Sequence, residues 1–332
     1  MKDDIPKKES KVCNCKKNSS DRGRRIAISI IIFLCILNVL SYIMIIPRSF
    51  SKVIIRRAIA YQLNKKYNEL TPDNYKHVKE LYLSDKKITN IKLLSELKNL
   101  EILTLYSLGT RNIYPTHLDR LLTKLGIRQF SSRRKINLRP LGTLTNIRIL
   151  NLSGSLVSNL EPLKNLKNLQ TLDLSMVSVS DYYSDPSKRL SKTQFLYSYE
   201  IRIPDLGPIG ELKNLQILDL SNTEVFNLEP LKNLVNLREL RFEYTLVSDL
   251  EPLRRLTNLQ KLDLSGTNVS DLEPLKELTN LRELGFNNTW VTDLEPLKGL
   301  KNLERLWLFS TSVKNEQIEE LQKALPIVKI SH

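Results

Sequence analysis

The sequence "LTNLQKLDLSGTNVSDLEPLKE", residues 256–277, is one complete copy of a pattern that recurs along the chain. Counted from its first leucine, apolar side chains occupy positions 1, 4, 7, 9, 14, 17 and 20, with Thr at position 12 and Pro at position 19. The pattern starts again at Leu144, Leu166, Leu212, Leu234, Leu278 and Leu300. Consecutive starts are evenly spaced, except that the interval from Leu166 to Leu212 is more than twice as long, which indicates an array of internal repeats.

Each position of this copy has a physical interpretation. Leu262 and Leu264 alternate with polar residues, which predicts a short strand with one buried face. Asp271 can cap a helical segment, and Pro274 suits the first turn of that segment, where backbone donors lack partners. Asn258, at position 3, suits a left-handed turn that closes the segment. One unit alone buries little apolar surface, so we expect the units to stack around a shared core.

Threonine occupies position 12 in five copies. We expect these residues to form a ladder in which each hydroxyl bonds the neighbouring turn; they are Thr223, Thr245, Thr267, Thr289 and Thr311.

The pattern L-x-x-L-x-x-L-x-L-x-x-T-x-V-x-D-L-x-P-L resembles the 22-residue leucine-rich repeat of bacterial internalin-like proteins. The family most often has Asn at position 12, where this chain has Thr. The resemblance implies an α/β fold: a horseshoe-shaped solenoid with a parallel sheet on its concave face and short helical segments on its convex face. It indicates little about function, because such repeats serve many unrelated interactions.

Looser copies extend the array upstream, with starts at Tyr75, Leu97 and Leu122. In the long interval between Leu166 and Leu212, a frame that starts at Leu190 restores the register. We therefore interpret the interval as one degenerate repeat, residues 190–211, plus two extra residues; an inserted functional loop is the alternative. Counted in this way, about 11 repeats occupy residues 75–321.

Helical caps are expected at both ends, because a solenoid must cover its terminal units. Residues 50–74 contain an amphipathic helix around 52–66 and resemble the helical cap that opens such bacterial arrays. At the other end we expect a helix from about Glu316 to Leu325, with Asn315 as its N-cap and Pro326 after it. A short edge strand then completes the C-terminal cap, whose last part is residues 322–332.

The run "IAISIIIFLCILNVLSYIMII", residues 26–46, is strongly apolar and contains no charged residue. A helix of that length is roughly 30 Å long, the thickness of a bilayer core, which predicts a single transmembrane helix. A buried soluble helix and a cleaved signal peptide are the alternatives. Residues 6–25, before the span, contain eight Lys or Arg, and residues 47–66, after it, contain six, which favours a cytoplasmic N-terminus and extracytoplasmic repeats.

The charge is concentrated near the N-terminus. Residues 1–74 carry 15 basic and 6 acidic residues and so supply +9 of the net charge of +15. The polar, basic tail, residues 1–25, is predicted to be disordered and suited to contact with anionic lipid. The remaining +6 belongs to residues 75–332, too small a charge for the strongly basic surface expected of a nucleic-acid-binding domain.

Aromatic residues on the strand face predicted to be concave are the candidate ligand-binding residues. In the degenerate repeat they are Phe195, Tyr197 and Tyr199, and in the last repeats they are Trp290, Trp307 and Phe309. Further candidates are Tyr82, Tyr106 and Tyr244. Exposed aromatic residues contribute strongly to protein interfaces. The alternative is that these side chains cover imperfect repeats or pack against the C-terminal cap.

A second candidate surface is basic. Residues 122–143 contain six Lys or Arg and no acid, and a repeat turn within them carries Arg133, Arg134 and Lys135. This basic rim could meet an acidic partner, a lipid headgroup or a polyanion, whereas a solvated basic face is the alternative.

The sequence contains no signature of catalysis, a cofactor or a metal site. His77, His117 and His332 stand at neither triad nor metal-ligand spacing, and no glycine-rich phosphate loop is present. We therefore predict a membrane-anchored recognition protein that binds a protein or surface ligand through its concave face. A structural scaffold of a membrane complex and a cytoplasmic-facing adaptor are the alternatives.

Overall fold

The computed structural model describes residues 51–84, 88, 90–105, 135–157, 159–177 and 205–332. The chain divides into two units, Met1–Ser49 and Phe50–His332, and every described residue belongs to the second. Across these described ranges, no helix combines the length and the apolar character that a bilayer crossing requires. The predicted span, residues 26–46, and the predicted basic tail, residues 1–25, lie outside them.

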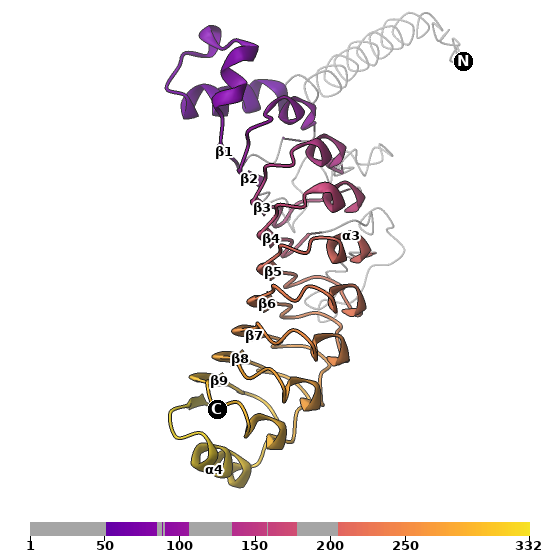
Figure 1. Cartoon of the computed structure of the whole chain (residues 1–332), viewed down its shortest axis with the longest axis vertical. Coiled ribbons are helices and arrows are strands. Elements are labelled where there is room, and N and C mark those ends of the chain that lie inside the picture. Colours follow the sequence, from indigo (N-terminus) through magenta and orange to yellow (C-terminus); the bar gives the residue numbers. More distant parts are fainter. Residues whose placement is uncertain (1–50, 85–87, 89, 106–134, 158, 178–204) are drawn as a thin grey trace, which may run out of the picture. The chain divides into compact units, whose positions relative to one another are not determined.

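Ten strands of the described residues form one parallel sheet in chain order (Figure 1). Their bounds are β1 Glu80–Leu83, β2 Ile102–Leu105, β3 Ile149–Asn151, β4 Thr171–Asp173, β5 Ile217–Asp219, β6 Glu239–Arg241, β7 Lys261–Asp263, β8 Glu283–Gly285, β9 Arg305–Trp307 and β10 Lys329–Ser331. Leucines at position 7 stand opposite one another, as Leu240 and Leu262 do, because each repeat enters the sheet in the same register.

Short helices lie along the other side of the array (Figure 1). Most are 3-10 helices: η1 Tyr67–Glu69, η2 Pro72–His77, η3 Lys92–Glu96, η4 Arg139–Thr143, η5 Glu161–Asn165, η9 Glu229–Leu231, η10 Glu251–Leu253, η11 Glu273–Leu275 and η12 Glu295–Leu297. The α-helices are α3 Gly207–Gly210, α4 Asn315–Ala324 and a helix that includes residues 51–62. In η11 the Asp271 carboxylate accepts a hydrogen bond of 2.8 Å from the Glu273 N–H, so the aspartate caps the segment from one residue before the N-cap, Leu272.

One hydrophobic core runs from Ile55 in the N-terminal cap to Val328 beside the last strand. The leucines at positions 1, 4, 7, 17 and 20 of the regular repeats are almost fully buried between the sheet and the helices. Burial of a leucine side chain is worth about 1.5–3 kcal/mol before entropic costs. The parallel sheet and short helices confirm the predicted leucine-rich-repeat solenoid.

The prediction of a separate repeat at residues 190–211 is wrong. Strand β4 pairs directly with β5, with Leu172 opposite Leu218, so the sheet has no place for a strand between them. Helix α3 likewise contacts both η5 and η9. Asp205 and Pro208 therefore complete the repeat that begins at Leu166, and this one repeat is more than twice as long as its regular neighbours.

The loose copy predicted at residues 122–143 is also not a separate repeat; it is part of a second unusually long one. Strand β2 pairs directly with β3, with Leu103 opposite Leu150, and η4 contacts both η3 and η5. Arg139–Thr143 thus completes the repeat that begins at Leu97. Nine repeats in the described part of the chain contribute β1 to β9, instead of the predicted 11 or so.

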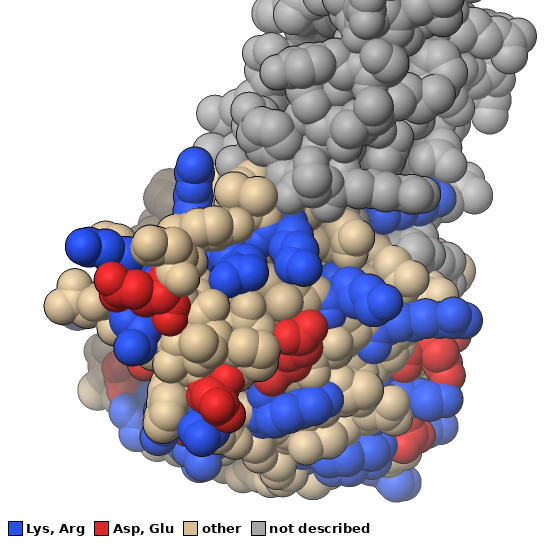
Figure 2. Space-filling view, turned by 90° about the horizontal axis from the view of Figure 1, so that it is seen from above, with Lys and Arg blue, Asp and Glu red and all other residues tan. Residues whose placement is uncertain are grey.

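Both ends of the array carry helices. Residues 51–62 are helical, with Ile55 and Ile59 fully buried, and Lys and Arg side chains gather on this end of the molecule (Figure 2). At the C-terminus α4 buries Leu321, and β10 pairs with β9. The predicted N-cap, Asn315, is wrong by one residue: Lys314 occupies that position, with extended backbone and no side-chain capping bond.

Two expectations about polar ladders are also corrected. The left-handed residue of a repeat stands at position 11, as in Asn222 and Gly266, and not at position 3. The position-3 side chain bonds the preceding repeat instead: Asn258 Nδ2 donates to the Val235 carbonyl at 2.8 Å. Threonine bonds its own repeat, since the Thr267 hydroxyl donates to the Leu264 carbonyl at 2.6 Å. Asparagine, and not threonine, therefore forms the ladder between units.

Candidate functional site

The open face of the sheet carries the side chains at positions 6 and 8 of each repeat, because the leucines at position 7 point into the core. In the C-terminal repeats, position 6 alternates in charge from strand to strand. Glu283 on β8 pairs with Lys261 on β7 at 3.3 Å and with Arg305 on β9. This alternation could have been read from the sequence, but the candidate site residues were chosen among aromatic and basic side chains only. The residues concerned are Glu239, Lys261, Glu283 and Arg305.

Trp307, at position 8 of β9, is half-buried on this open face. The guanidinium carbon of Arg305 lies 5.9 Å from the centre of its ring, a cation–π distance. Gly285 stands opposite Trp307 on β8, and a Cβ atom at Gly285 would come within 2.9 Å of Asp263 Oδ1. The neighbouring strand β8 therefore presents bare backbone beside the tryptophan, and the carboxylate of Asp263 on β7 lies on the other side of that glycine.

Phe309, at position 10, follows β9 and is 48% exposed. Its backbone N–H donates to Asn287 Oδ1 at 2.8 Å, and Asn287 Nδ2 donates to the Ser265 hydroxyl at 3.2 Å. Position 10 thus forms a chain of hydrogen bonds across three repeats. This chain fixes the backbone that presents the phenyl ring.

Tyr244 and Trp290 lie in the turns after the strands and not on the sheet face itself. Tyr244 has φ of 53° and is 58% exposed, and a Cβ atom built on Gly266 would lie 2.5 Å from its ring. The ring therefore lies over the glycine of the next repeat. Trp290, 68% exposed, follows Leu246 and Asn268 in the row at position 13, roughly 10 Å from Leu246 across two strand spacings.

We call the set of Tyr244, Leu246, Trp290, Trp307 and Phe309 the C-terminal aromatic surface. Four of these residues were predicted, and they occupy the strand or the following turn in the repeats of β6, β8 and β9. Leu246 was not predicted, because only aromatic side chains were considered. N–H groups at position 13 donate to carbonyls of the preceding repeat, as Trp290 does to Val269 at 2.9 Å, so the row is tied into the array.

Carboxylates lie beside this surface. Burial raises the pKa of the Glu243 carboxyl, and the neighbouring Asp263 and Asp219 raise it further, while Arg241 lowers it. Farther from this surface, on β4, burial also raises the pKa of Asp173, although hydrogen bonds from Ser175 oppose the change. The aromatic residues therefore border a region with acidic character.

The other predicted site residues have different outcomes. Phe195, Tyr197, Tyr199, Tyr106, Arg133 and Arg134 lie outside the described residues. Direct pairing of β4 with β5 excludes the sheet position predicted for the first three. Lys135 is half-buried next to the bridge between Ile136 and Val157. Tyr82 on β1 is exposed, and its hydroxyl donates to Glu80 at 3.0 Å, which raises the pKa of Tyr82.

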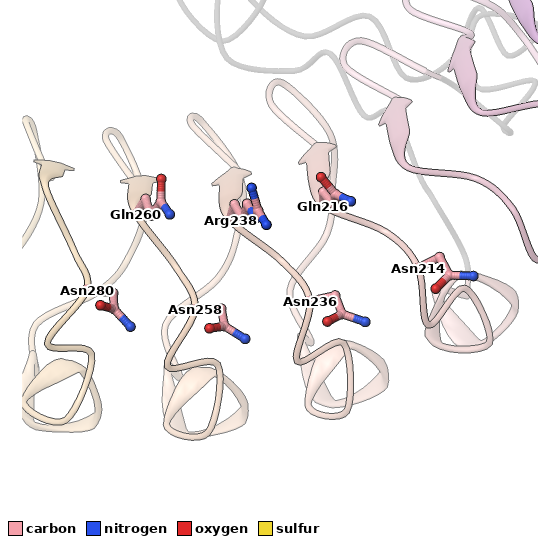
Figure 3. A pocket seen from close by; sticks show the side chains of 7 residues that line it. All are labelled: Asn214, Gln216, Asn236, Arg238, Asn258, Gln260 and Asn280. Carbon is pink, nitrogen blue, oxygen red and sulfur yellow. The ribbon is translucent and has the colours of Figure 1, made fainter.

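A polar groove of about 490 Å³ runs beside the strands of the C-terminal repeats (Figure 3). Its lining residues occupy positions 3 and 5: Asn214, Gln216, Asn236, Arg238, Asn258, Gln260 and Asn280. The four asparagines donate their amide N–H groups to carbonyls of the preceding repeat. Because each of these asparagines bonds one repeat to the one before it, we assign the groove a structural role and place the candidate site at the C-terminal aromatic surface.

Comparison with known proteins agrees with this architecture. Residues 235–277 and 279–323 match the family model of leucine rich repeats in two copies. No curated protein sequence matches the chain significantly.

Solved structures extend the likeness to most of the chain. Internalin C2 from Listeria monocytogenes is 24% identical, with a TM-score of 0.57 over 79% of this chain and 92% of that chain. A plant peptide hormone receptor, RGFR1 in complex with RGF2, is 17% identical, with a TM-score of 0.51 over 77% of this chain and 36% of the receptor chain. These similarities establish an internalin-like leucine-rich-repeat fold, which by itself does not specify a ligand.

Proposed function

We propose that this chain is a membrane-anchored recognition protein that binds a protein partner through the C-terminal aromatic surface and the adjoining open face of the sheet. Residues 26–46 form the anchor, the N-terminus is cytoplasmic and the repeats are extracytoplasmic. No catalytic role is proposed. Leucine-rich repeats typically serve protein recognition, which supports the general class.

The observation that carries the proposal is the exposure of large apolar side chains on an otherwise polar repeat surface. Tyr244, Trp290 and Phe309 are 58%, 68% and 48% exposed, respectively. Aromatic residues of this kind are enriched among the residues that dominate binding energy. Regular neighbouring repeats place small or polar residues at position 10, such as Ser221 and Ser265, so the repeat itself does not require Phe309.

The surface is also rigid before binding. The bonds from Phe309 through Asn287 to Ser265 and the ion pairs of Glu283 fix its backbone and its charged neighbours. A preorganised surface loses less conformational entropy when a partner binds, so more of the apolar contact appears as affinity.

Site-specific photo-crosslinking of the full chain in its native membrane tests this assignment. A photoreactive residue replaces Asn268, which lies between Leu246 and Trp290 in the row at position 13, and a second replaces the exposed Thr145, in the repeat that begins at Leu144, as a distant control. We expect a discrete protein adduct from position 268 and a loss of at least about tenfold in its yield with Y244A/W290A/F309A, since each buried aromatic anchor contributes strongly to affinity.

Trp307 stays intact in this variant because it is half-buried and contributes to packing. Far-UV circular dichroism should show unchanged secondary structure. An adduct whose yield is the same in the triple variant, or the same from position 145, contradicts the assignment of the site. Protease digestion of the repeats in intact cells tests the topology separately, since only extracytoplasmic repeats are accessible.

A further inference from the structure

The helix of residues 51–62 in the N-terminal cap has two different faces. Ile55, Ile59 and Ala60 are buried against the first repeat. Arg57 and Tyr61 are exposed one turn apart on the outer face, and Tyr61 is 89% exposed, the highest value among the large apolar residues of the described chain. The outer face therefore presents an aromatic ring that the fold itself leaves uncovered.

The cations around Tyr61 are also without acidic partners in the described ranges. Arg57, Lys65 and Lys66 are exposed, and none of them forms a side-chain ion pair within the part of the chain that the structure describes. We call these three residues and Tyr61 the cap face. Figure 2 shows blue Lys and Arg side chains spread over this end of the molecule, with fewer red Asp and Glu side chains among them.

Many other cations in the cap and the repeats have a bonded partner. Arg56 donates to the Leu70 carbonyl at 3.1 Å and lies 5.1 Å from the centre of the Tyr67 ring. In the C-terminal repeats, the residue after E-P-L pairs with the glutamate, as Arg254 does with Glu251 at 2.5 Å. Cations grouped around an exposed tyrosine, with no ion pair among the described residues, thus distinguish the cap face from the regular surface of the array.

We propose that the cap face lies against the headgroups of an anionic phospholipid membrane. Lys and Arg are attracted to anionic leaflets, and tyrosine is enriched where a protein meets the membrane–water interface. This inference rests on the proposed anchor, which ends at Ile46, five residues before Ser51, the first helical residue that the structure describes. Five residues span at most about 18 Å, so an anchored chain holds the beginning of the cap helix near the headgroups.

The test uses the full chain reconstituted in phosphatidylcholine vesicles with and without phosphatidylglycerol. Three single-cysteine forms each carry one fluorophore: Q62C next to Tyr61, I327C at the far end of the array, and native Cys35 within the proposed anchor, with the other cysteines changed to serine. Nitroxide on the lipid headgroups quenches a label at the membrane surface, and nitroxide on the acyl chains quenches an inserted label.

We expect headgroup quenching of the label at position 62 that is at least about twofold stronger with phosphatidylglycerol, because basic side chains add attraction to an anionic surface. The label at position 327 should not be quenched. The cap variant R57Q/K65Q/K66Q should lose the dependence on phosphatidylglycerol, whereas K314Q/K323Q/K329Q, which removes the same charge from the other end, should retain it. Raising the salt concentration from 0.1 M to 1 M shortens the screening length from about 10 Å to 3 Å and should act as the cap variant does.

Equal quenching at positions 62 and 327, or equal behaviour of the two charge variants, overturns the inference. If soluble polyglutamate shifts the emission of the label at position 62 and phosphatidylglycerol does not, the cap face binds an acidic protein and the lipid assignment fails. Acyl-chain quenching of Cys35 without quenching at position 62 retains the anchor and rejects the cap face. The reverse result supports the cap face and rejects the anchor.

Discussion

Glu243 holds a carboxyl group in a place that disfavours its charge. Burial is the largest cause of its raised pKa, followed by the neighbouring Asp263 and Asp219. A carboxyl group whose pKa is higher in the folded chain than in the unfolded chain stays protonated up to a higher pH in the folded chain. Stability therefore falls as the pH rises from the ordinary glutamate pKa of about 4.3 through the raised folded value.

We predict that E243Q unfolds at a higher temperature than the parent at pH 7, and that this difference shrinks as the pH falls toward 4. The amide removes the charge without changing the shape of the side chain. E251Q is the matched control: its hydrogen-bonded partner Arg254 lowers the pKa of Glu251, so the same substitution should not stabilise the chain at neutral pH. Thermal unfolding followed by circular dichroism over this pH range measures both. A pH-independent gain in E243Q would falsify the electrostatic explanation.

Repeat position predicted much of the candidate site at the level of single residues. Trp307 falls at position 8 and Phe309 at position 10, so periodicity alone placed them on or beside the open sheet face. It could not show that the Tyr244 ring lies over Gly266, because that contact joins side chain and backbone of different repeats. The charge environment of Glu243 could not be predicted from its repeat position either, because it depends on carboxylates that belong to the preceding and the following repeats.

Between elements, asparagines at position 3 tie consecutive repeats together. Asn236, Asn258, Asn280 and Asn302 each donate an amide N–H to a carbonyl of the preceding repeat, at 2.8 to 2.9 Å. The sequence shows that asparagine recurs at this position but not why. A local turn and a bond between repeats favour the same residue, and only the stacked structure distinguishes the two.

This ladder gives a prediction for single substitutions. N258A removes one hydrogen bond between units and should lower the free energy of unfolding by about 1 kcal/mol, the net value of a typical hydrogen bond. N258D should cost more, because a carboxylate cannot donate to the Val235 carbonyl and would face it with like charge. Urea unfolding measures both effects.

The matched control is N268A, at an exposed asparagine for which no side-chain hydrogen bond is found among the described residues. Its stability should remain close to that of the parent. If N258A and N268A have equal midpoints, the bond between repeats contributes nothing measurable. If Asn258 served a left-handed turn, N258G would be at least as stable as the parent, since glycine favours that conformation.

For the array as a whole, the number of repeats depends on which strands are neighbours. The regular period predicted the regular units because their leucines must point into one core. The same period predicted a unit at residues 190–211, since a few apolar residues match such a loose template by chance. Pairing of β4 with β5 corrects this, and it is information about the sheet that no local pattern contains.

Deletion of residues 181–204 tests the corrected architecture. The deletion joins Ser180 to Asp205 and restores one repeat of the regular length, "LKNLQTLDLSMVSVSDLGPIGE". Because no strand of the described sheet lies in the deleted segment, we expect the urea m-value and the unfolding midpoint to remain near those of the parent. The m-value is the informative quantity, since it scales with the surface that unfolding exposes.

Deletion of residues 234–255 provides the comparison, because it also preserves register but removes β6 and η10. That deletion should lower the m-value by roughly a tenth, the share of one repeat among nine. If residues 190–211 were instead a stacked unit, removal of residues 181–204 would lower the m-value by a similar amount and expose two core surfaces at the break. An m-value for the 181–204 deletion that matches the 234–255 deletion would therefore restore the degenerate repeat, whereas a parental value establishes the segment as an insertion within one unit.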